Sequence, residues 1–100
     1  MTLIRSELIG FGHYLPAKVL TNDDMAKMVE TNDEWISTRT GIKSRHVAAE
    51  NEFTSDISLI AARNALKSAN ISAEDLDLII VATVTTDDTT PSTAAKISGK

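Results

Sequence analysis

The chain has 100 residues, of which 42% are hydrophobic and 4% aromatic, and its formal net charge is −4. This length allows one small domain at most, with a modest core built from aliphatic side chains and alanines. The negative charge argues against nucleic acid or an anionic membrane as the main partner. No run approaches the roughly 20 apolar residues of a membrane helix, and we do not expect a secretory signal at the N-terminus. We therefore expect a soluble, cytoplasmic protein.

The sequence contains no cysteine. Within these residues this excludes disulfides, a zinc–thiolate site and a thiol nucleophile. No metal site is expected either. His13 stands without a second ligand at the usual spacing, and the adjacent carboxylates of Asp87 and Asp88 are more typical of a solvated turn.

The first element is a predicted strand over residues 3–11. Gly10 and Gly12 flank Phe11, which indicates a bend or a close approach of another backbone.

Two capped helices are predicted next, because Thr21–Asp24 and Thr31–Glu34 repeat one pattern ten residues apart. In the first, Thr21 and Asp24 approximate a capping box. Three apolar residues at helical spacing follow and are expected to pack in the core; they are Met25, Met28 and Val29.

The second helix carries the only tryptophan of the chain, Trp35. Asn32 is its predicted N-cap and Gly41 its predicted stop. Arg39 follows Trp35 by four residues and should share its face. The spacing alone favours Trp35 as a core anchor. The alternative is a ligand site, in which the indole stacks on a nucleobase and the guanidinium binds phosphate.

Residues 42–48 are predicted to be extended, with Arg45 and His46 at the rim. A long helix over residues 55–69 follows, capped by Thr54 or Ser55 and ended by Asn70. Its wide apolar arc predicts packing against a sheet and a further neighbour.

The last third combines a capped turn at residues 72–75 with a strand over residues 76–84, which an unbroken apolar run predicts to be buried in a parallel sheet. The order of strand, helices and strand makes a right-handed crossover the expected topology. The polar loop 85–90 then leads to a helix from Pro91, with Thr90 as its cap. Loops at this end of a parallel strand are common ligand sites.

Five segments together resemble one protein family. Thr31–Arg45 is similar to the signature TSDEW-I-xx-RTGI-xx-R of β-ketoacyl-[acyl-carrier-protein] synthase III, the condensing enzyme that initiates bacterial fatty acid synthesis. The other four match its motifs IxGxGxYLP, TNxDL, LIIVAT and PSxA, in family order and at family spacing; they are Ile9–Pro16, Thr21–Asp24, Leu78–Thr83 and Pro91–Ala95.

The resemblance implies an α/β, thiolase-like fold, layered α-β-α-β-α in the full enzyme, of which residues 1–100 form part of the N-terminal half. It implies an acyltransferase that condenses acyl-coenzyme A with malonyl-acyl-carrier-protein, with no permanently bound cofactor and a homodimeric enzyme. The family's catalytic Cys lies beyond the PSxA motif, and its His and Asn lie in the C-terminal half. No catalytic residue is therefore expected within this chain, and the fragment alone is expected to be inactive.

The resemblance also assigns binding residues. Trp35 matches the family tryptophan that stacks on the adenine of coenzyme A, Arg39 the arginine beside it, and Thr31 a residue that hydrogen-bonds the adenine edge. Thr90 stands where many members carry Phe, which closes the acyl pocket of the dimer partner. The smaller Thr predicts tolerance of primers longer than acetyl.

Three alternatives remain open. The first is that the protein is a related acyltransferase of secondary metabolism. The second is that the chain is a non-catalytic module for coenzyme A binding or dimerisation. Alternatively, the 100 residues do not fold alone, because a buried strand without neighbours leaves unpaired sheet edges.

Overall fold

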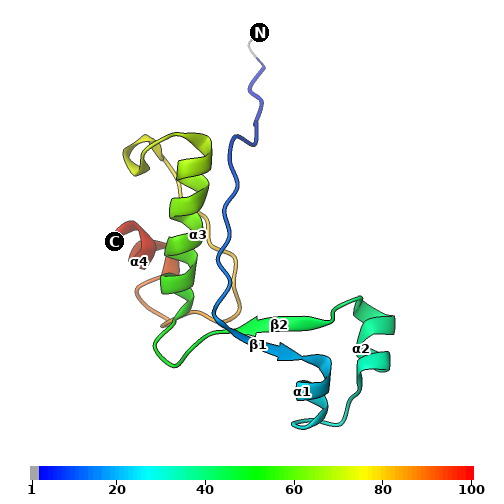
Figure 1. The fold of residues 1–100 in the computed structure, drawn as a ribbon. Coiled ribbons are helices and arrows are strands. Elements are labelled where there is room, and N and C mark those ends of the chain that lie inside the picture. The colour runs from blue at the N-terminus through cyan, green and yellow to red at the C-terminus, as the bar shows by residue number, and fades with distance from the viewer. Residues whose placement is uncertain (1–2) are drawn as a thin grey trace. The chain divides into compact units, whose positions relative to one another are not determined.

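A computed structural model describes residues 3–100, which divide into two compact units (Figure 1). We call residues 15–52 the hairpin unit, and residues 3–14 together with 53–100 the helix unit. Each unit is described by itself below.

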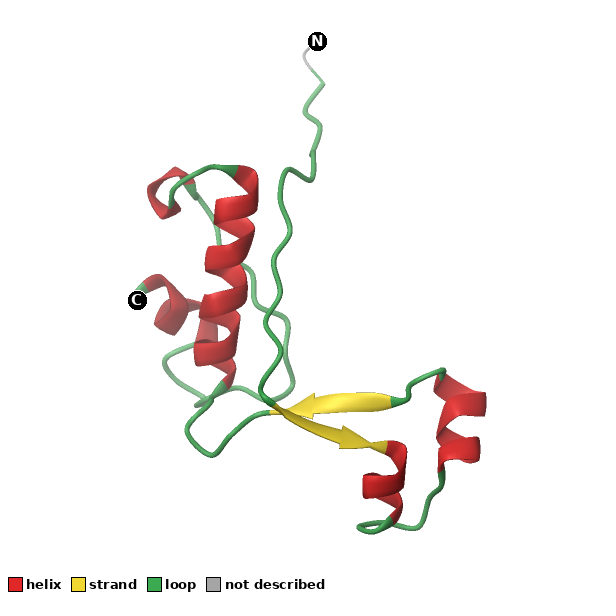
Figure 2. Ribbon diagram, in the orientation of Figure 1, coloured by secondary structure: helices red, strands yellow, loops and turns green. Residues whose placement is uncertain are grey.

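The hairpin unit is built on two short antiparallel strands, β1 (Lys18–Thr21) and β2 (Ser44–Val47). Lys18 pairs with Val47 at one end of the ladder and Thr21 with Ser44 at the other. Two helices connect the strands, α1 (Asn22–Ala26) and α2 (Asp33–Thr40), as Figure 2 shows. The predicted extended segment over residues 42–48 is thus confirmed as β2.

Both predicted helix starts are confirmed. The Asp24 carboxylate accepts from the Thr21 N–H at 2.9 Å, which completes the capping box before α1. Before α2, the side chain of Asn32 accepts from the Trp35 N–H at 2.7 Å, and Gly41 ends the helix in the left-handed conformation at φ 72°, which glycine adopts at little cost.

The apolar face expected after Thr21 does not form. Helix α1 ends at Ala26, so the spacing that should align its apolar side chains is lost within two turns. Met28 and Val29 lie beyond the helix and are 62% and 54% exposed. The prediction that they pack in the core is therefore wrong.

The helix unit contains α3 (Thr54–Ala69), the short 3₁₀ helix η1 (Ala73–Asp75) and α4 (Thr93–Ser98). Asn70 ends α3 in the left-handed conformation, as predicted. Helix α4 packs against α3 (Figure 1) and supplies Ile97, a buried core side chain that is 8% exposed. None of the helices in this range is long and apolar enough to cross a membrane.

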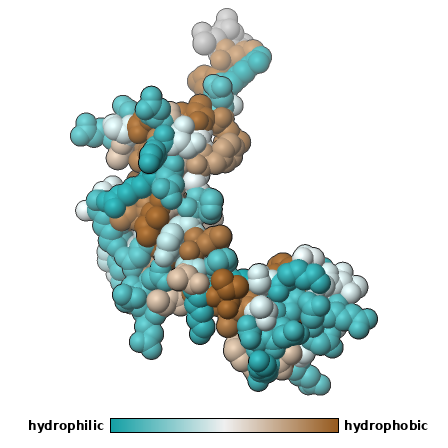
Figure 3. Space-filling view, in the orientation of Figure 1, coloured by the Kyte–Doolittle hydropathy of each residue, from teal (hydrophilic) through white to brown (hydrophobic). Residues whose placement is uncertain are grey.

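The segments 3–11 and 76–84 are not strands in this structure, contrary to prediction, and no parallel crossover is formed between them. A strand requires a hydrogen-bonded neighbour, and neither segment has one. Their apolar side chains remain largely uncovered, among them Ile4, Leu8, Leu78 and Ile80, which are 74–97% exposed. Figure 3 shows apolar surface along the N-terminal segment.

The N-terminal segment nevertheless packs closely against α3, and its two glycines make this possible. A Cβ at Gly12 would lie 2.3 Å from the backbone oxygen of Ala61 and from the backbone nitrogen of Ala65. A Cβ at Gly10 would lie 2.7 Å from the Ala65 oxygen. Real Cβ atoms do not approach backbone this closely, so the predicted close approach is confirmed.

Helix α4 begins two residues later than predicted. Its N-cap is Ser92, whose hydroxyl accepts from the Ala95 N–H at 3.1 Å. Thr90 and Pro91 therefore belong to the preceding loop, and Thr90 is not a cap. Serine is at least as good an N-cap as threonine, which explains why the later start is preferred.

Candidate functional site

Trp35 and Arg39 lie side by side on α2. The guanidinium carbon of Arg39 is 4.7 Å from the centroid of the Trp35 ring, within the range of a cation–π contact. Trp35 is 54% exposed. The shared face is thus confirmed, whereas the interpretation of Trp35 as a core anchor is wrong, because more than half of its side chain stays in solvent.

A small pocket of about 220 Å³ opens beside this ring, lined by Glu30, Thr31, Asn32 and Trp35. Pockets for complete small ligands usually measure about 300–1,000 Å³, so this one suits a single ring or group. The Thr31 hydroxyl oxygen is enclosed by protein and has no hydrogen-bond partner. The structure therefore places Thr31 and Trp35 in one pocket, with Arg39 over the Trp35 ring one helical turn further along α2.

The position of α2 depends on Asn22, which is 2% exposed. Its amide nitrogen donates to the Asp33 carboxylate at 2.7 Å and to the Ile42 carbonyl at 2.8 Å. Asp33 also accepts from the Ser37 hydroxyl at 2.9 Å. One buried side chain thus ties the start of α1 to the first turn of α2 and to the segment that follows it.

The amide oxygen of Asn22 has a partner as well. It accepts from Arg45 Nη2 at 2.8 Å, while Arg45 Nη1 donates to the Leu20 carbonyl at 3.3 Å. Arg45 was expected at the rim; it is instead half-buried and links β2 to β1. From the sequence, Asn22 was predicted only as part of a helix start. The hydrogen-bond partners of its side chain lie 11 to 23 residues away, so no local sequence pattern indicates them.

The same contacts set the charge at the start of α2. The amide of Asn22, and then the hydroxyl of Ser37, stabilise the ionised Asp33 carboxylate and lower its pKa from the ordinary value. Lys43 adds an ion pair at 3.6 Å. Asp33 therefore stays negative at neutral pH, where it complements the positive end of the helix dipole.

Thr90, the fourth predicted site residue, lies in the helix unit and is exposed. A pocket of about 350 Å³ borders its loop and is lined by residues on both sides, including Thr89 and Ser92, but not by Thr90 itself. Of the four predicted site residues, Thr31, Trp35 and Arg39 thus lie in the hairpin unit and Thr90 in the helix unit.

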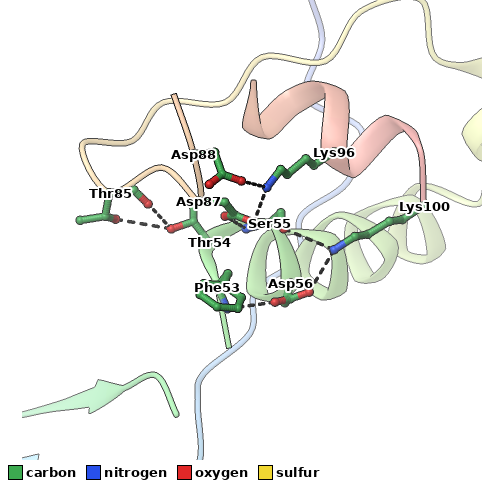
Figure 4. A network of polar contacts seen from close by, with 9 residues as sticks. All are labelled: Phe53, Thr54, Ser55, Asp56, Thr85, Asp87, Asp88, Lys96 and Lys100. Atoms are coloured by element: carbon green, nitrogen blue, oxygen red, sulfur yellow. Dashed lines mark hydrogen bonds and ion pairs between the residues drawn. The ribbon is translucent and has the colours of Figure 1, made fainter. Parts of the chain in front are cut away.

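The loop that carries Thr90 is fastened to the start of α3 by Asp87 (Figure 4). One carboxylate oxygen accepts from the Ser55 N–H at 2.8 Å and the other from the Ser55 hydroxyl at 2.5 Å. The N-cap residue of α3 is Phe53, not the predicted Thr54 or Ser55, and its side chain cannot accept a hydrogen bond. Asp87 supplies the missing acceptor from 32 residues further along the chain.

Two carboxylates and two lysines surround this contact. Lys96 lies 3.7 Å from Asp87 and also pairs with Asp88, while Lys100 contacts Asp56 at 3.0 Å. The Asp87 side chain is 8% exposed and that of Asp88 58%. The interpretation of both as solvated turn residues is therefore correct for Asp88 and wrong for Asp87.

Acidification is expected to weaken the helix unit through this network. Hydrogen bonds from Ser55 lower the pKa of Asp87, and the Phe53 N–H lowers that of Asp56. A carboxylate with a depressed folded-state pKa contributes stability above its unfolded-state pKa of about 4, and that contribution is lost as pH falls through the folded-state value. The hydrogen bond to Asp88 raises the pKa of Lys96, so this lysine stays charged in the same range.

Urea unfolding of the full-length protein between pH 7 and pH 3 measures this loss. The variant Asp87→Asn should be less stable at pH 7 and lose less stability on acidification than the wild type. Asp88→Asn is the matched control and should keep the wild-type pH profile. Parallel profiles for the wild type and Asp87→Asn would contradict the prediction.

No family model matches the chain, but individual relatives do. It is 56% identical over 97 residues to β-ketoacyl-[acyl-carrier-protein] synthase III of Rhodospirillum centenum, covering 97% of this chain and 30% of the relative. The crystal structure of 3-oxoacyl-[acyl-carrier-protein] synthase III from Aquifex aeolicus matches with a TM-score of 0.83 and 53% identity, over 91% of this chain and 29% of that one.

A third match is the priming β-ketosynthase of the R1128 polyketide biosynthetic pathway, with a TM-score of 0.84 and 33% identity, over 92% of this chain and 28% of that one. Together these matches assign the chain to the thiolase-like α/β class, of whose fold it covers about 29%. Within that class it is a homologue of the β-ketoacyl-[acyl-carrier-protein] synthases III. It spans about 30% of the length of the curated relatives that it matches.

Proposed function

We propose that these residues form the N-terminal portion of a β-ketoacyl-[acyl-carrier-protein] synthase III, which initiates fatty acid synthesis by condensing acyl-coenzyme A with malonyl-acyl-carrier-protein. The observation that carries the proposal is the exposed Trp35 ring with Arg39 over it, beside a ring-sized pocket. Homology to enzymes named for this reaction supports it.

In this proposal α2 forms the entrance for coenzyme A. The free face of Trp35 stacks on the adenine, and the Arg39 guanidinium completes the stack and attracts the phosphates. Thr31 binds the adenine edge. Because its hydroxyl is enclosed and unpaired, a rotation about its Cα–Cβ bond has to turn the hydroxyl into the pocket, and the new hydrogen bond then offsets the cost of the orphaned group.

The catalytic residues lie outside this chain in the proposal. The sequence contains no cysteine, so a thiol nucleophile, with its His and Asn, comes from polypeptide beyond Lys100. No permanently bound cofactor takes part; acyl-coenzyme A is a substrate. The working enzyme is a cytoplasmic homodimer.

Transfer of radiolabelled acetyl from acetyl-coenzyme A to protein tests this proposal. The full-length protein should become labelled and, with malonyl-acyl-carrier-protein, release a β-ketoacyl product, whereas the 100-residue chain should stay unlabelled. Labelling of the 100-residue chain would mean that a nucleophile other than cysteine acts. A full-length protein that no acyl-coenzyme A labels would refute the proposal.

Thr90 is proposed to set primer length, because its small side chain leaves the acyl pocket open where Phe would close it. Replacing it in the full-length enzyme (Thr90→Phe) should leave kcat/KM for acetyl-coenzyme A within a few-fold and lower kcat/KM for octanoyl-coenzyme A by about 100-fold, since an overfilled pocket rejects the longer chain. Thr90→Ser controls for loss of the threonine itself. A wild type that accepts only acetyl would overturn the assignment.

A second candidate is a synthase-III-like acyltransferase of secondary metabolism. Similarity to the R1128 priming ketosynthase favours it, although at lower identity than the fatty acid enzymes. Competition between the fatty acid acyl carrier protein and a polyketide carrier protein as malonyl donor distinguishes the two. A preference for the polyketide carrier would favour the second candidate.

A further inference from the structure

The loop 85–90 has no helix or strand of its own, and its shape depends on a few side-chain contacts. Thr54 donates its hydroxyl proton to the Thr85 carbonyl, and Ser55 donates twice to Asp87. Both anchors come from the first turn of α3, as Figure 4 shows. The loop is therefore attached to α3, the longest helix of the helix unit.

Asp87 is the strongest of these anchors. Ser55 is 1% exposed and the Asp87 side chain 8%, so the contact is shielded from water. Two hydrogen bonds to one carboxylate fix its orientation as well as its position, and bonds to an ionised acceptor are about twice as strong as neutral ones. Asp88, one residue further on, is mostly exposed and paired only with Lys96 among the contacts of residues 3–100.

Thr90 follows Asp87 by three residues and precedes Ser92, the cap of α4, by two. Three residues span about 10 Å at full extension, so Thr90 is held on a short piece of chain between two fixed points. A shift of either anchor must move Thr90.

We propose that Asp87 is a positioning residue that holds Thr90 in place where it faces the acyl pocket of the dimer partner, and thereby sets the range of primer lengths. This inference rests on the proposed function. Asp87 touches no substrate in it; it acts through the loop. The competing explanation is that Asp87 only caps α3 and stabilises the fold.

Kinetics of the full-length enzyme separate these explanations. A purely structural role lowers the active fraction and reduces kcat/KM for acetyl- and octanoyl-coenzyme A by the same factor. A positioning role changes their ratio. The Asp87→Asn substitution removes the negative charge of the group that accepts both hydrogen bonds from Ser55. We therefore expect the ratio of the two kcat/KM values to change by about tenfold.

Two further variants sharpen the test. Ser55→Ala keeps the backbone bond and removes the hydroxyl, so its ratio should change by about threefold; it also decides the matter if Asp87→Asn fails to fold. Asp88→Asn is the control and should leave the ratio within twofold. Combined with Thr90→Phe, the Asp87→Asn change should be non-additive, since both act on one pocket residue.

Equal losses for both primers in Asp87→Asn and Ser55→Ala would overturn the inference while leaving the proposed function intact. Additive effects of Asp87→Asn and Thr90→Phe in the double-mutant cycle would do the same. Absence of transfer from every acyl-coenzyme A in the wild type would overturn the proposed function, and the inference with it.

Discussion

Replacing Trp35 by alanine in the full-length protein is expected to lower kcat/KM for acetyl-coenzyme A by about 5- to 150-fold. Stacking of a base on an aromatic ring is worth about 1–3 kcal/mol by alanine substitution, and the Trp35 ring offers an exposed face with Arg39 behind it. The fold should change little, because 54% of the side chain already lies in solvent. Steady-state kinetics and thermal unfolding measure the two effects separately.

A truncated substrate supplies the control for this experiment. The acetyl thioester of pantetheine carries the reacting group but lacks the nucleotide, so Trp35→Ala should use it as well as the wild type does. The Trp35→Phe variant keeps a smaller aromatic ring, so its kcat/KM for acetyl-coenzyme A should lie between those of the wild type and Trp35→Ala. Equal losses with the truncated and the complete substrate would show that the ring does not bind the nucleotide.

Replacing Asn22 by alanine is expected to destabilise the hairpin unit by about 2–4 kcal/mol, because it leaves several shielded groups without partners at once. Asp33 and the Ile42 carbonyl lose a donor, and the Arg45 guanidinium loses an acceptor. Helix α2 then loses its main polar tie to α1, so KM for acyl-coenzyme A should rise as well.

Hydrogen exchange of peptides from residues 15–52, measured in the full-length protein, reports this local loss. Asn51→Ala is a matched control, because Asn51 occupies an exposed turn; it should change stability by less than about 0.5 kcal/mol. Equal protection in Asn22→Ala and Asn51→Ala would mean that the contacts of Asn22 are dispensable.

Local signals predicted the helices well. Asn32 and Gly41 bracket α2, and Asn70 ends α3, because each acts on the backbone next to it. The Trp35–Arg39 pair was predicted for the same reason, since four residues along a helix bring two side chains to one face. The hydroxyl of Thr31 was placed at the site only through the family resemblance.

Features that depend on distant parts of the chain were missed. Asp87 caps α3 across 32 residues, and Asn22 joins residues up to 23 positions away; neither contact leaves a periodic trace in the sequence. The apolar runs 3–11 and 76–84 predicted strands from composition, but a strand forms only when a partner satisfies its backbone groups. These two segments have no such partner here.

The distant cap of α3 also bears on the order in which the chain is made. Residues 54–69 leave the ribosome well before Asp87, so the first turn of the helix is synthesised without its acceptor. Asp87 lies 32 positions beyond Ser55, so synthesis at about 5–20 residues per second delays the cap by roughly 2–6 s. While the chain is being synthesised, the C-terminal end of α3 at Asn70 should therefore be helical. Its N-terminal end at Thr54 should fray until the loop 85–90 has emerged and Asp87 has bound Ser55.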